Sequence, residues 1–461
     1  MAGGTDKTTG KREWIYTASV KGRFQRWHRW SGIALQALLF VTPWILINGE
    51  QALRLDLPGR RLFALGLTFT PRDTIFLVLM LLFGAFSLFF FTSLFGRLWC
   101  GYACPQTVFL EEWVRPIEKL WEGERGARMK RDAGPLTAET VGRKVGKWLS
   151  FAAVAALVSM TVVSYFAGAR ALWTGAAGPV AYAFVAVVGA VLLADFGWFR
   201  EQFCNYLCPY ARFQGALTDD ESQVVAYAVS LGEPRQTKEN RKAAASGLLA
   251  RESLGACIDC NKCVAVCPQG IDIREGYQLE CIACARCVDA CTGVMDKMGQ
   301  PSLIQYTTIA ETEGRKPRVL RGRTAVYGGL LTALAGLFVV ALLGRHEIEA
   351  TVNRAPGTLF QVDADGWTRN TFLLNLSNNH GTPGGEPAPF TVGVEGIPGA
   401  EIIAPPIAVA PADGARVPLV VRVPPTVDLP RTAPIRITVK TAFDEIVVDT
   451  TFKTDRTTGE G

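Results

Sequence analysis

Eight cysteines lie in two runs between residues 257 and 291, and both runs have the spacing C-x2-C-x2-C-x3-C. A cubane iron–sulfur cluster takes four thiolates, one at each corner of a tetrahedron. In two-cluster ferredoxins the first three cysteines of a run bind one cluster, and the fourth binds the other. The spacing therefore predicts one [4Fe-4S] cluster on Cys257, Cys260, Cys263 and Cys291. It predicts a second [4Fe-4S] cluster on Cys267, Cys281, Cys284 and Cys287.

Structural zinc sites are the alternative for these eight thiols. Zinc sites usually show two separated C-x2-C pairs, whereas this chain has two runs of four cysteines. Two features depart from the usual ferredoxin pattern: Thr292 replaces the proline expected after the last cysteine, and only 13 residues separate Cys267 from Cys281. Both departures are compatible with a compact domain, so the spacing favours iron–sulfur ligation.

The other four cysteines form two Cys-x3-Cys-Pro pairs, Cys100/Cys104 and Cys204/Cys208. Residues i and i+4 of a helix share one face, so each pair is expected to present two thiols to one ion. The proline that follows tends to end a helix at the second cysteine. Thiolates are soft ligands that favour Cu(I), zinc or the iron of iron–sulfur clusters. The alternative is that these cysteines only pack between helices, as buried free cysteines commonly do.

Composition excludes several classes of protein. The chain has 461 residues, which suggests two to four domains. Its net charge is +6, and its Lys and Arg residues cluster beside apolar segments. That distribution indicates membrane topology, and nucleic acid is not expected as a partner. The cysteine pattern favours metal ligation on a reducing side of a membrane over a disulfide framework. Of three histidines only His28 is expected on the cytoplasmic side, so a bis-histidine haem is excluded.

Apolar runs that approach the ~18–20 residues needed to cross a bilayer occur five times. Any one run could instead be a buried core helix, but five with so little charge predict a polytopic α-helical membrane protein. Pro43 lies inside the first run, which membrane helices tolerate. Residues 31–199 are expected to form two hairpin repeats, each ending at a Cys-x3-Cys-Pro pair. The predicted helices span about 31–49, 74–96, 148–168, 179–199 and 324–344.

The charged flanks predict the orientation. The arm at 1–30, the loop at 97–147 and the segment before the fifth helix are rich in Lys and Arg. The positive-inside rule places them, and the ferredoxin-type insert at 200–323 with its cluster core at 253–300, in the cytoplasm. After five crossings, residues 350–461 lie in the periplasm, outside a bacterial inner membrane; the loop at 50–73 supports this orientation least. Period-two segments in 350–461 predict an immunoglobulin-like β-sandwich, either a docking domain or a passive stalk.

Together these features resemble the CcoG (FixG/RdxA) family, accessory proteins of cbb3-type cytochrome oxidase assembly. The resemblance covers nearly the whole chain, including the basic arm, the helix order, both C-x-Y-x-C-P motifs, the double ferredoxin run and the β tail. It implies a membrane-bound cupric reductase that supplies Cu(I) to the haem-copper centre of the oxidase. The two clusters would relay electrons, and the catalytic, copper-binding residues would be Cys100, Cys104, Cys204 and Cys208.

The partners implied are the inner membrane, copper ions, and cbb3-type oxidase subunits or copper chaperones. The cytoplasmic electron donor is undetermined, and a homo-oligomer is left open. One alternative is an electron-transfer subunit similar to the membrane ferredoxins of nitrate and nitrous-oxide respiration, which would oxidise quinol. The lack of an obvious flavin-attachment motif and of a haem pair weakens that alternative. Another is a non-redox assembly scaffold with structural clusters.

Overall fold

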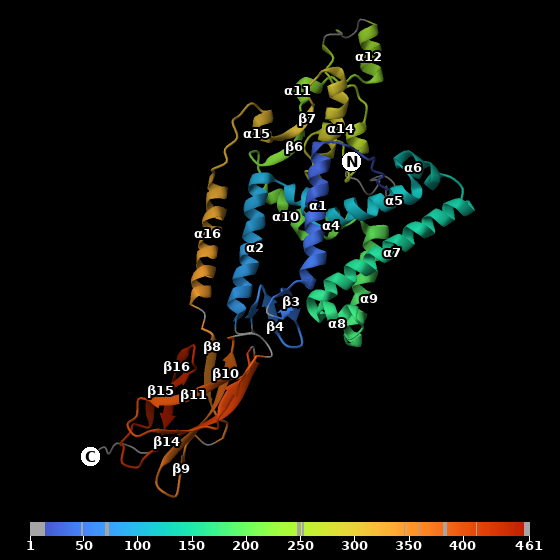
Figure 1. Ribbon diagram of the computed structural model, residues 1–461. Helices are drawn as coiled ribbons and strands as arrows, with labels where there is room; N and C mark the ends of the chain where they lie inside the picture. The colour runs from blue at the N-terminus through green and yellow to red at the C-terminus, as the bar shows by residue number, and fades with distance from the viewer. Residues whose placement is uncertain are drawn as a thin grey trace. The chain divides into compact units, whose positions relative to one another are not determined.

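The computed structural model describes residues 14–47, 49–69, 73–246, 250, 253–344, 346–357, 359–380, 385–411 and 413–455 (Figure 1). The first 13 residues of the predicted basic arm and the last six of the predicted β domain therefore lie outside the described residues. The chain divides into two compact units. The first comprises Met1–Trp44 and Leu77–Leu337, and the second comprises Ile45–Phe76 and Phe338–Gly461.

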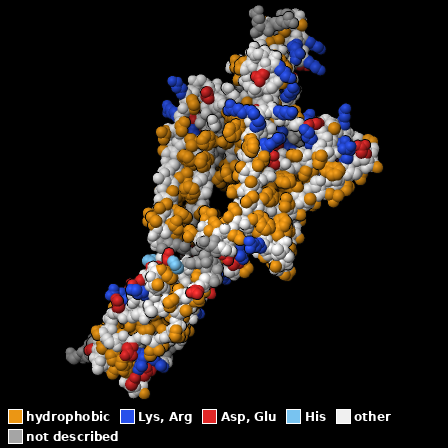
Figure 2. All heavy atoms as spheres, in the orientation of Figure 1, with side chains coloured by type: hydrophobic (Ala, Val, Ile, Leu, Met, Phe, Trp, Pro, Cys, Tyr) orange, Lys and Arg blue, Asp and Glu red, His pale blue; other side chains and the backbone are white. Residues whose placement is uncertain are grey.

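Within the described ranges, four helices are long and apolar enough to cross a membrane. Most of their side chains are exposed, and Figure 2 shows hydrophobic side chains gathered over the helical part of the chain. Apolar surface of this extent is favourable in lipid and costly in water. The prediction of a helical membrane protein is confirmed with these four spans. They are α2 (Thr74–Phe95), α7 (Ala138–Ala167), the segment Pro179–Phe199 with α9 (Pro179–Ala194) and a π-helical turn, and α16 (Gly322–Leu343).

The first predicted span, 31–49, has different bounds in the structure. The helix α1 extends over Arg23–Val41, so it begins within the basic arm. It ends before Pro43, which lies in a 3-10 turn (Thr42–Trp44), and a short strand β1 (Leu46–Ile47) follows. Proline lacks the N–H that would continue the helix, and its ring clashes with the preceding turn. The expectation that Pro43 lies within a spanning helix is wrong, and a fifth span remains a prediction.

Short helices follow α2 and α9 at the ends that carry the Cys-x3-Cys-Pro pairs. After α2 come α3 (Leu98–Tyr102), α4 (Pro105–Phe109), a π-helical turn η3 (Leu110–Val114), α5 (Arg115–Glu122) and α6 (Arg125–Ala133). After α9 come the π-helical turns η4 (Asp195–Phe199) and η5 (Phe203–Leu207), then α10 (Pro209–Leu217).

The ferredoxin-type region is built on an antiparallel pair of strands, β6 (Gln223–Tyr227) and β7 (Ile304–Thr308). Between them lie α11 (Val229–Gly232), α12 (Lys238–Ala245), α13 (Lys262–Ala265) and α14 (Arg286–Met295), and α15 (Ile309–Thr312) follows. A buried apolar core that includes Val225, Met295 and Ile304 joins the strands to α14. This core holds the two cysteine runs against each other.

The second unit contains two antiparallel sheets that enclose one apolar core, as the period-two pattern predicts for a β-sandwich. Side chains of β10 alternate between buried and exposed, and Phe372 and Leu374 face Ile437 and Phe452 in the core. One sheet has the order β12 (Glu401–Ile403), β14 (Asp413–Val423), β10 (Thr368–Asn378), β8 (Ile348–Arg354), with β9 (Gln361–Val362) paired to β10. The other has the order β13 (Ile407–Val409), β11 (Ala388–Glu395), β15 (Thr432–Lys440), β16 (Glu445–Lys453).

The connection between α1 and α2 belongs to this second unit. It forms small antiparallel strands: β2 (Glu50–Gln51) pairs with β1, and β3 (Leu53–Asp56), β4 (Arg61–Ala64) and β5 (Leu67–Phe69) form a meander. Arg61 Nη2 lies 3.7 Å from Asp413 Oδ1. The ring of Phe76 packs 5.7 Å from that of Phe338. The loop whose charges supported the predicted orientation least therefore contacts the β domain through one exposed ion pair, whereas the contact of Phe76 with Phe338 joins α2 to α16.

Candidate redox site

The two cysteine runs fold into loops with the same backbone conformation. Asp259 and Asn261 flank Cys260 with positive φ, and Ala283 and Ala285 flank Cys284 in the same way. The left-handed region costs a non-glycine residue roughly 1–2 kcal/mol, so the surrounding fold must impose it. Alternation of left- and right-handed residues turns successive backbone N–H groups to one side, which creates the anion-binding concavity found at many iron–sulfur sites. The repeated spacing thus produces a repeated nest.

The cysteines group around two small cavities. One is lined by Cys257, Cys260, Cys263 and Cys291. The other is lined by Cys267, Cys281, Cys284 and Cys287, together with Cys263. Each cavity is lined by three cysteines of one run and the last cysteine of the other run. Cys263 lines both cavities. This grouping supports the ligand sets that the spacing predicts.

The donor set at each cavity fits a [4Fe-4S] cluster. Across the part of the chain that the structure describes, no three Cys, His, Asp or Glu side chains converge as ligands of a single metal ion would. A cubane cluster makes a different demand, because each of its irons takes one thiolate and the four sulfurs surround the cluster. Four thiols line each cavity, and backbone N–H groups donate to the sulfurs of Cys267, Cys281 and Cys284, so the donor sets meet that demand.

Burial disfavours the ionised form of several cluster-loop thiols. It raises the pKa of Cys267 and of Cys281 to about 11, and that of Cys284 to about 12. A coordinating thiol is deprotonated outright, so metal binding at these residues releases protons. Buried cysteines of this kind are inert as surface nucleophiles, which suits a role as ligands.

In the Cys-x3-Cys-Pro pairs the two cysteines do not share one helix. Cys100 lies in α3 and Cys204 in the π-helical turn η5, whereas Cys104 and Cys208 are extended N-cap residues of α4 and α10. A residue before proline is pushed out of the helical region, and proline is favoured at the first position of the next helix. The expectation of two thiols on one helix face is therefore wrong.

The four thiols of these pairs lie within electrostatic reach of one another, although they do not converge as the ligands of a single metal ion would, and they are here called the four-thiol site (Cys100, Cys104, Cys204 and Cys208). Burial raises the pKa of Cys100 to about 11, and part of this net shift comes from the neighbouring Cys104 and Cys208. Burial likewise raises the pKa of Cys204, with Cys104, Cys100 and Cys208 adding to the shift. Such mutual electrostatic effects require proximity. The tertiary structure thus brings together two pairs that lie far apart in the sequence.

The four-thiol site touches the second cysteine loop of the ferredoxin region. Cys100 packs in a small buried cluster with Ile282 and Cys284, flanked by Tyr210. The hydroxyl of Tyr102 donates to the carbonyl of Cys284 at 3.4 Å. At Gly101 an added Cβ would lie 2.7 Å from the carbonyl oxygen of Ile282 and 3.0 Å from Cα of Cys284, so only glycine allows this approach. The two groups of cysteines are therefore in direct contact through Cys100 and Cys284.

Several polar residues that the sequence did not single out support the four-thiol site. Gln214 of α10 is fully buried, and its Nε2 donates to Cys100 Sγ at 3.3 Å. The guanidinium of Arg97 donates to the carbonyls of Leu279 and Ala211, which links α10 to the ferredoxin region. Gln106 donates to the Asp195 carboxylate at 3.0 Å, which gives this acid a partner at the end of α9. Only the position of Gln214 and Gln106 shortly after a Cys-Pro step could have indicated them.

A buried ionic cluster fixes the second cysteine loop to the helices after α2. Glu111 of η3 accepts from Arg286, which precedes Cys287, and pairs with Arg115 Nε at 2.9 Å. Arg115 also donates to the carbonyl of Pro268, next to Cys267, at 3.3 Å. All three charged side chains are buried, and such a cluster is stable only while every member keeps its partner. In the sequence, the only indication of this cluster was the acidic Glu111 within the apolar run around Phe109.

The described end of the N-terminal arm, residues 14–20, has a structural role beyond its predicted charge. Ala18 N donates to the carbonyl of Ala265 at 2.8 Å, and Arg128 of α6 donates to the carbonyl of Thr17 at 2.8 Å. The arm therefore ties the ferredoxin region to α6. Further along the chain His28 is buried, and its Nδ1 lies 3.8 Å from Glu112 Oε1. The centre of its ring lies 5.5 Å from that of Tyr102.

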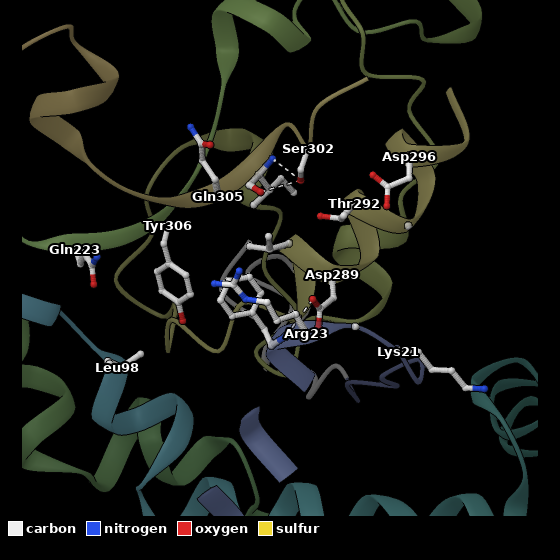
Figure 3. Close-up of a pocket in the computed structure, with 15 residues that line it drawn as sticks. Lys21, Arg23, Leu98, Gln223, Asp289, Thr292, Asp296, Ser302, Gln305 and Tyr306 are labelled. Carbon is white, nitrogen blue, oxygen red and sulfur yellow. Dashed lines mark hydrogen bonds between the residues drawn. The ribbon is translucent and has the colours of Figure 1, made fainter. Parts of the chain in front are cut away.

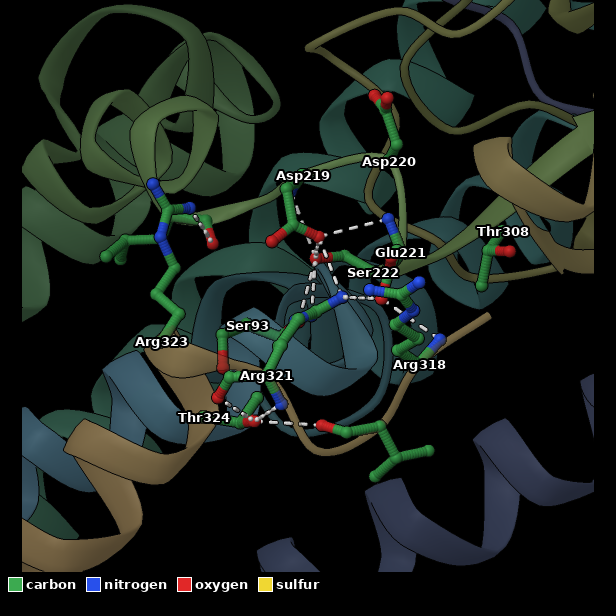
Figure 4. A network of polar contacts seen from close by, with 12 residues as sticks. Ser93, Asp219, Asp220, Glu221, Ser222, Thr308, Arg318, Arg321, Arg323 and Thr324 are labelled. Carbon is green, nitrogen blue, oxygen red and sulfur yellow. Dashed lines mark hydrogen bonds and ion pairs between the residues drawn. The ribbon is translucent and has the colours of Figure 1, made fainter. Parts of the chain in front are cut away.

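A polar network joins α16 to the end of α2 beside the ferredoxin region (Figure 4). Arg321, one residue before α16, lies 2.9 Å from Asp219 Oδ1 and donates to the carbonyl of Ser93. The hydroxyl of Ser222 donates to the same carbonyl at 2.7 Å. These bonds hold the two ends of the ferredoxin-type insert, Asp219 and Arg321, against one membrane helix.

Two ferredoxin-type cavities next to membrane helices define a class: this is a membrane iron–sulfur protein with an oxidoreductase or electron-transfer role. Three family models match the chain. A 4Fe-4S dicluster domain matches residues 199–309, and a 4Fe-4S binding domain matches residues 77–122. A domain described as the Ig-like fold at the C-terminal of FixG matches residues 338–455.

Relatives narrow the class to a family. The nitrogen fixation protein FixG of Rhizobium meliloti is 36% identical over 410 residues, which cover 80% of this chain and 77% of FixG. Protein RdxA of Cereibacter sphaeroides is 36% identical over 404 residues, covering 84% and 83%. The chain belongs to the FixG/CcoG family. A crystal structure of a FixG-related protein from Vibrio parahaemolyticus matches 24% of this chain at 18% identity, with a TM-score of 0.21, too low to bear on the fold.

Proposed function

We propose that this protein is a membrane-bound cupric reductase that converts Cu(II) to Cu(I) at the four-thiol site and supplies Cu(I) for assembly of cbb3-type cytochrome c oxidase. The observation that carries the reductase proposal is the buried contact of Cys100 with the cysteine loop at Cys284. Soft thiolates beside a one-electron relay are suited to produce and hold Cu(I). The part played in oxidase assembly rests on the family resemblance.

The residues of the chain have separate tasks in this proposal. The eight ferredoxin-run cysteines hold two [4Fe-4S] clusters, which when bound accept and donate electrons singly. The four-thiol site binds copper as substrate and loses its thiol protons as it does so. Gln214 donates to the sulfur of Cys100 and thereby stabilises its thiolate, since hydrogen bonds to a charged form favour that form. Arg97 lowers the pKa of Cys100 in the same direction.

The orientation is also proposed. Basic residues flank the helix ends next to the ferredoxin region, and the positive-inside rule puts that region in the cytoplasm. The connection between α1 and α2 contacts the β domain through Arg61 and Asp413, so both belong on one side of the membrane. That side is the periplasm, with the protein in the inner membrane. Copper would then be reduced at the cytoplasmic edge of the helices.

Single Cys→Ser variants at the four-thiol site test the proposal. Each should abolish Cu(II) reduction, measured with a Cu(I)-specific chelator, and should leave the visible absorbance of the clusters intact. A matched control is Ala103→Ser, which adds the same hydroxyl between Cys100 and Cys104 and removes no thiol. Unchanged copper reduction in all four cysteine variants would contradict the assignment of this site.

One observation favours a second candidate function. The 4Fe-4S binding domain that matches residues 77–122 contains Cys100 and Cys104 and none of the ferredoxin-run cysteines. A third cluster at the four-thiol site would make the protein an electron-transfer subunit whose acceptor is another protein. Iron content separates the two candidates: a cupric reductase with two clusters holds about eight irons per chain, and three clusters hold about twelve. In the second case Cys100→Ser loses about four irons; in the first it loses none.

A further inference from the structure

A cleft of about 740 Å³ lies beside the cysteine cavities, between the start of α1, α14 and β7 (Figure 3). Sites for small molecules and cofactors have volumes of roughly 300–1,000 Å³. The cleft contains none of the cysteines, so it is separate from both the cluster cavities and the four-thiol site. Its size and its position beside the cysteine cavities are those of a binding site for a small molecule that exchanges electrons with the relay.

Three residues that line the cleft also line a cysteine cavity or contact a cysteine loop. Ser302 lines the cleft, and its hydroxyl contacts the thiol of Cys291. Tyr306 lines it as well and donates from its hydroxyl to the carbonyl of Ala283, one residue before Cys284. Ile304 faces both the cleft and the cavity of Cys257. A molecule in the cleft is therefore one side chain away from each group of ligands, which is where an electron donor belongs.

The lining combines aromatic rings with cations. The rings of Phe24 and Tyr306 lie 5.2 Å apart, and Tyr306 points into the centre of the cleft in Figure 3. Lys21 and Arg23 are both exposed. The guanidinium of Arg23 lies 5.2 Å from the ring of Phe24, whereas the side chain of Lys21 points away from Tyr306 in Figure 3. Such a lining suits a planar ring system that carries an anionic group.

Two acids also line the cleft, and their positions leave the cations available. The Asp289 carboxylate accepts from the backbone N–H of Gln25 at 2.7 Å and of Phe24 at 3.2 Å, so it is used to cap α1. An added Cβ at Gly22 would overlap this carboxylate, which shows that the arm packs closely against α14. Asp296 lies away from Arg23 in Figure 3.

We propose that this cleft binds reduced flavin mononucleotide, with its ring system against Phe24 and Tyr306 and its phosphate at Arg23, as the electron donor. The proposal rests on the relay in the proposed function and names its donor. Flavins release electrons singly as clusters require, and the sequence shows no dinucleotide fingerprint for a nicotinamide donor. One reduced flavin loses two electrons and two protons and becomes oxidised flavin; two Cu(II) become two Cu(I), and the protons pass to solvent.

Gly293 offers a way to fill the cleft without disturbing the fold. It lies in α14 on the cleft wall, and an added Cβ would meet no atom within 4 Å. The variant Gly293→Trp therefore places its ring in the cleft. Gly126→Trp is the matched control, because Gly126 is an exposed helical glycine of α6 with the same open space and lies outside the cleft. The double variant Lys21→Gln/Arg23→Gln tests the cations, with Arg26→Gln as its control.

The experiment titrates full-length, cluster-loaded protein in detergent with flavin mononucleotide and follows quenching of flavin fluorescence, with copper absent. We expect saturable binding that Gly293→Trp weakens at least tenfold and Gly126→Trp leaves unchanged. The double cation variant should weaken binding about tenfold, and riboflavin, which lacks the phosphate, should bind the wild type about as weakly. Anaerobic reduced flavin mononucleotide should bleach the cluster absorbance with a rate that saturates, and more slowly in Gly293→Trp.

Three outcomes would overturn the proposal: flavin binding that does not saturate, equal affinity in the wild type and Gly293→Trp, or saturable cluster reduction by a short-chain quinol and none by reduced flavin. Because the titration contains no copper, a negative result leaves cupric reduction untouched. Conversely, a chain that binds flavin but reduces no copper would retain the donor site and lose the proposed function.

Discussion

Gly101→Ala tests the contact on which the reductase proposal depends. The added Cβ would lie 2.7 Å from the carbonyl oxygen of Ile282 and about 3 Å from backbone atoms of Cys284. Unstrained contacts between a carbon and another heavy atom lie near 3.5 Å, so the α3 helix and the cysteine loop must separate by several tenths of an ångström. Both partners are backbone atoms, which cannot rotate away. Overpacking of this kind costs about 1–3 kcal/mol.

A helical Gly→Ala change by itself stabilises by about 0.5–1 kcal/mol, so the net destabilisation expected for Gly101→Ala is about 1–2 kcal/mol. If the strain is relieved by opening the contact, that amount lowers the population of the closed arrangement by about fivefold to thirtyfold. Copper reduction should fall by a similar factor, with cluster absorbance unchanged. The assays are the Cu(I)-chelator rate and thermal unfolding in detergent.

Gly142→Ala is the matched control, because Gly142 is a helical glycine of α7 whose added Cβ would meet no atom within 4 Å. It should keep the wild-type rate and be slightly more stable. Wild-type copper reduction and stability in Gly101→Ala would refute the reasoning, since they would show that the two groups of cysteines are not in tight contact.

Three further predictions concern the residues around the sites. Glu111→Gln leaves Arg115 and Arg286 buried without their acid and should cost about 3–5 kcal/mol in thermal unfolding, whereas Glu124→Gln, in an exposed pair with Lys119, should cost below about 1 kcal/mol. Burial opposes the ionisation of Glu111, but Arg115 and Arg286 hold its pKa below the ordinary value of about 4.3. The free energy that ionised Glu111 contributes to folding is therefore complete above about pH 4.3 and is lost as the pH falls through the lower pKa of the folded state. The stability of the wild type should therefore decline more steeply in acid than that of Glu111→Gln. Gln214→Leu removes the donor to Cys100 and should weaken Cu(I) binding, measured by chelator competition, while iron content stays constant; equal affinity would assign Gln214 to packing alone.

Local patterns sufficed to predict much of this molecule. The spacing of Cys257, Cys260 and Cys263 predicted a ligand loop, and the structure shows the nest that such a loop requires at Asp259 and Asn261. Period-two alternation predicted the sandwich, since alternate side chains of a strand face opposite sides. The apolar run that became α2 was long enough to identify a membrane helix.

The errors and omissions arose where local patterns compete with one another or with distant contacts. Pro43 was compatible with a continuing membrane helix, yet in the structure it lies just past the end of α1. Cys104 stands before a proline, and the preference of that position for extended backbone overrode the i, i+4 pattern. Glu111 and Arg286 gave no signal as a pair, because their partnership depends on how the insert docks.

By itself the sequence determined the number of thiols, their division into ferredoxin runs and Cys-Pro pairs, and the long apolar helices and alternating strands of the two units. These properties depend on spacing over a few residues and on hydrophobic period. Only the tertiary structure decided that the two Cys-Pro pairs lie within electrostatic reach of each other, that Cys100 packs against the loop of Cys284, and that a cleft opens beside the cysteine cavities. Those features are contacts between segments remote in the chain, which packing of the whole first unit brings together.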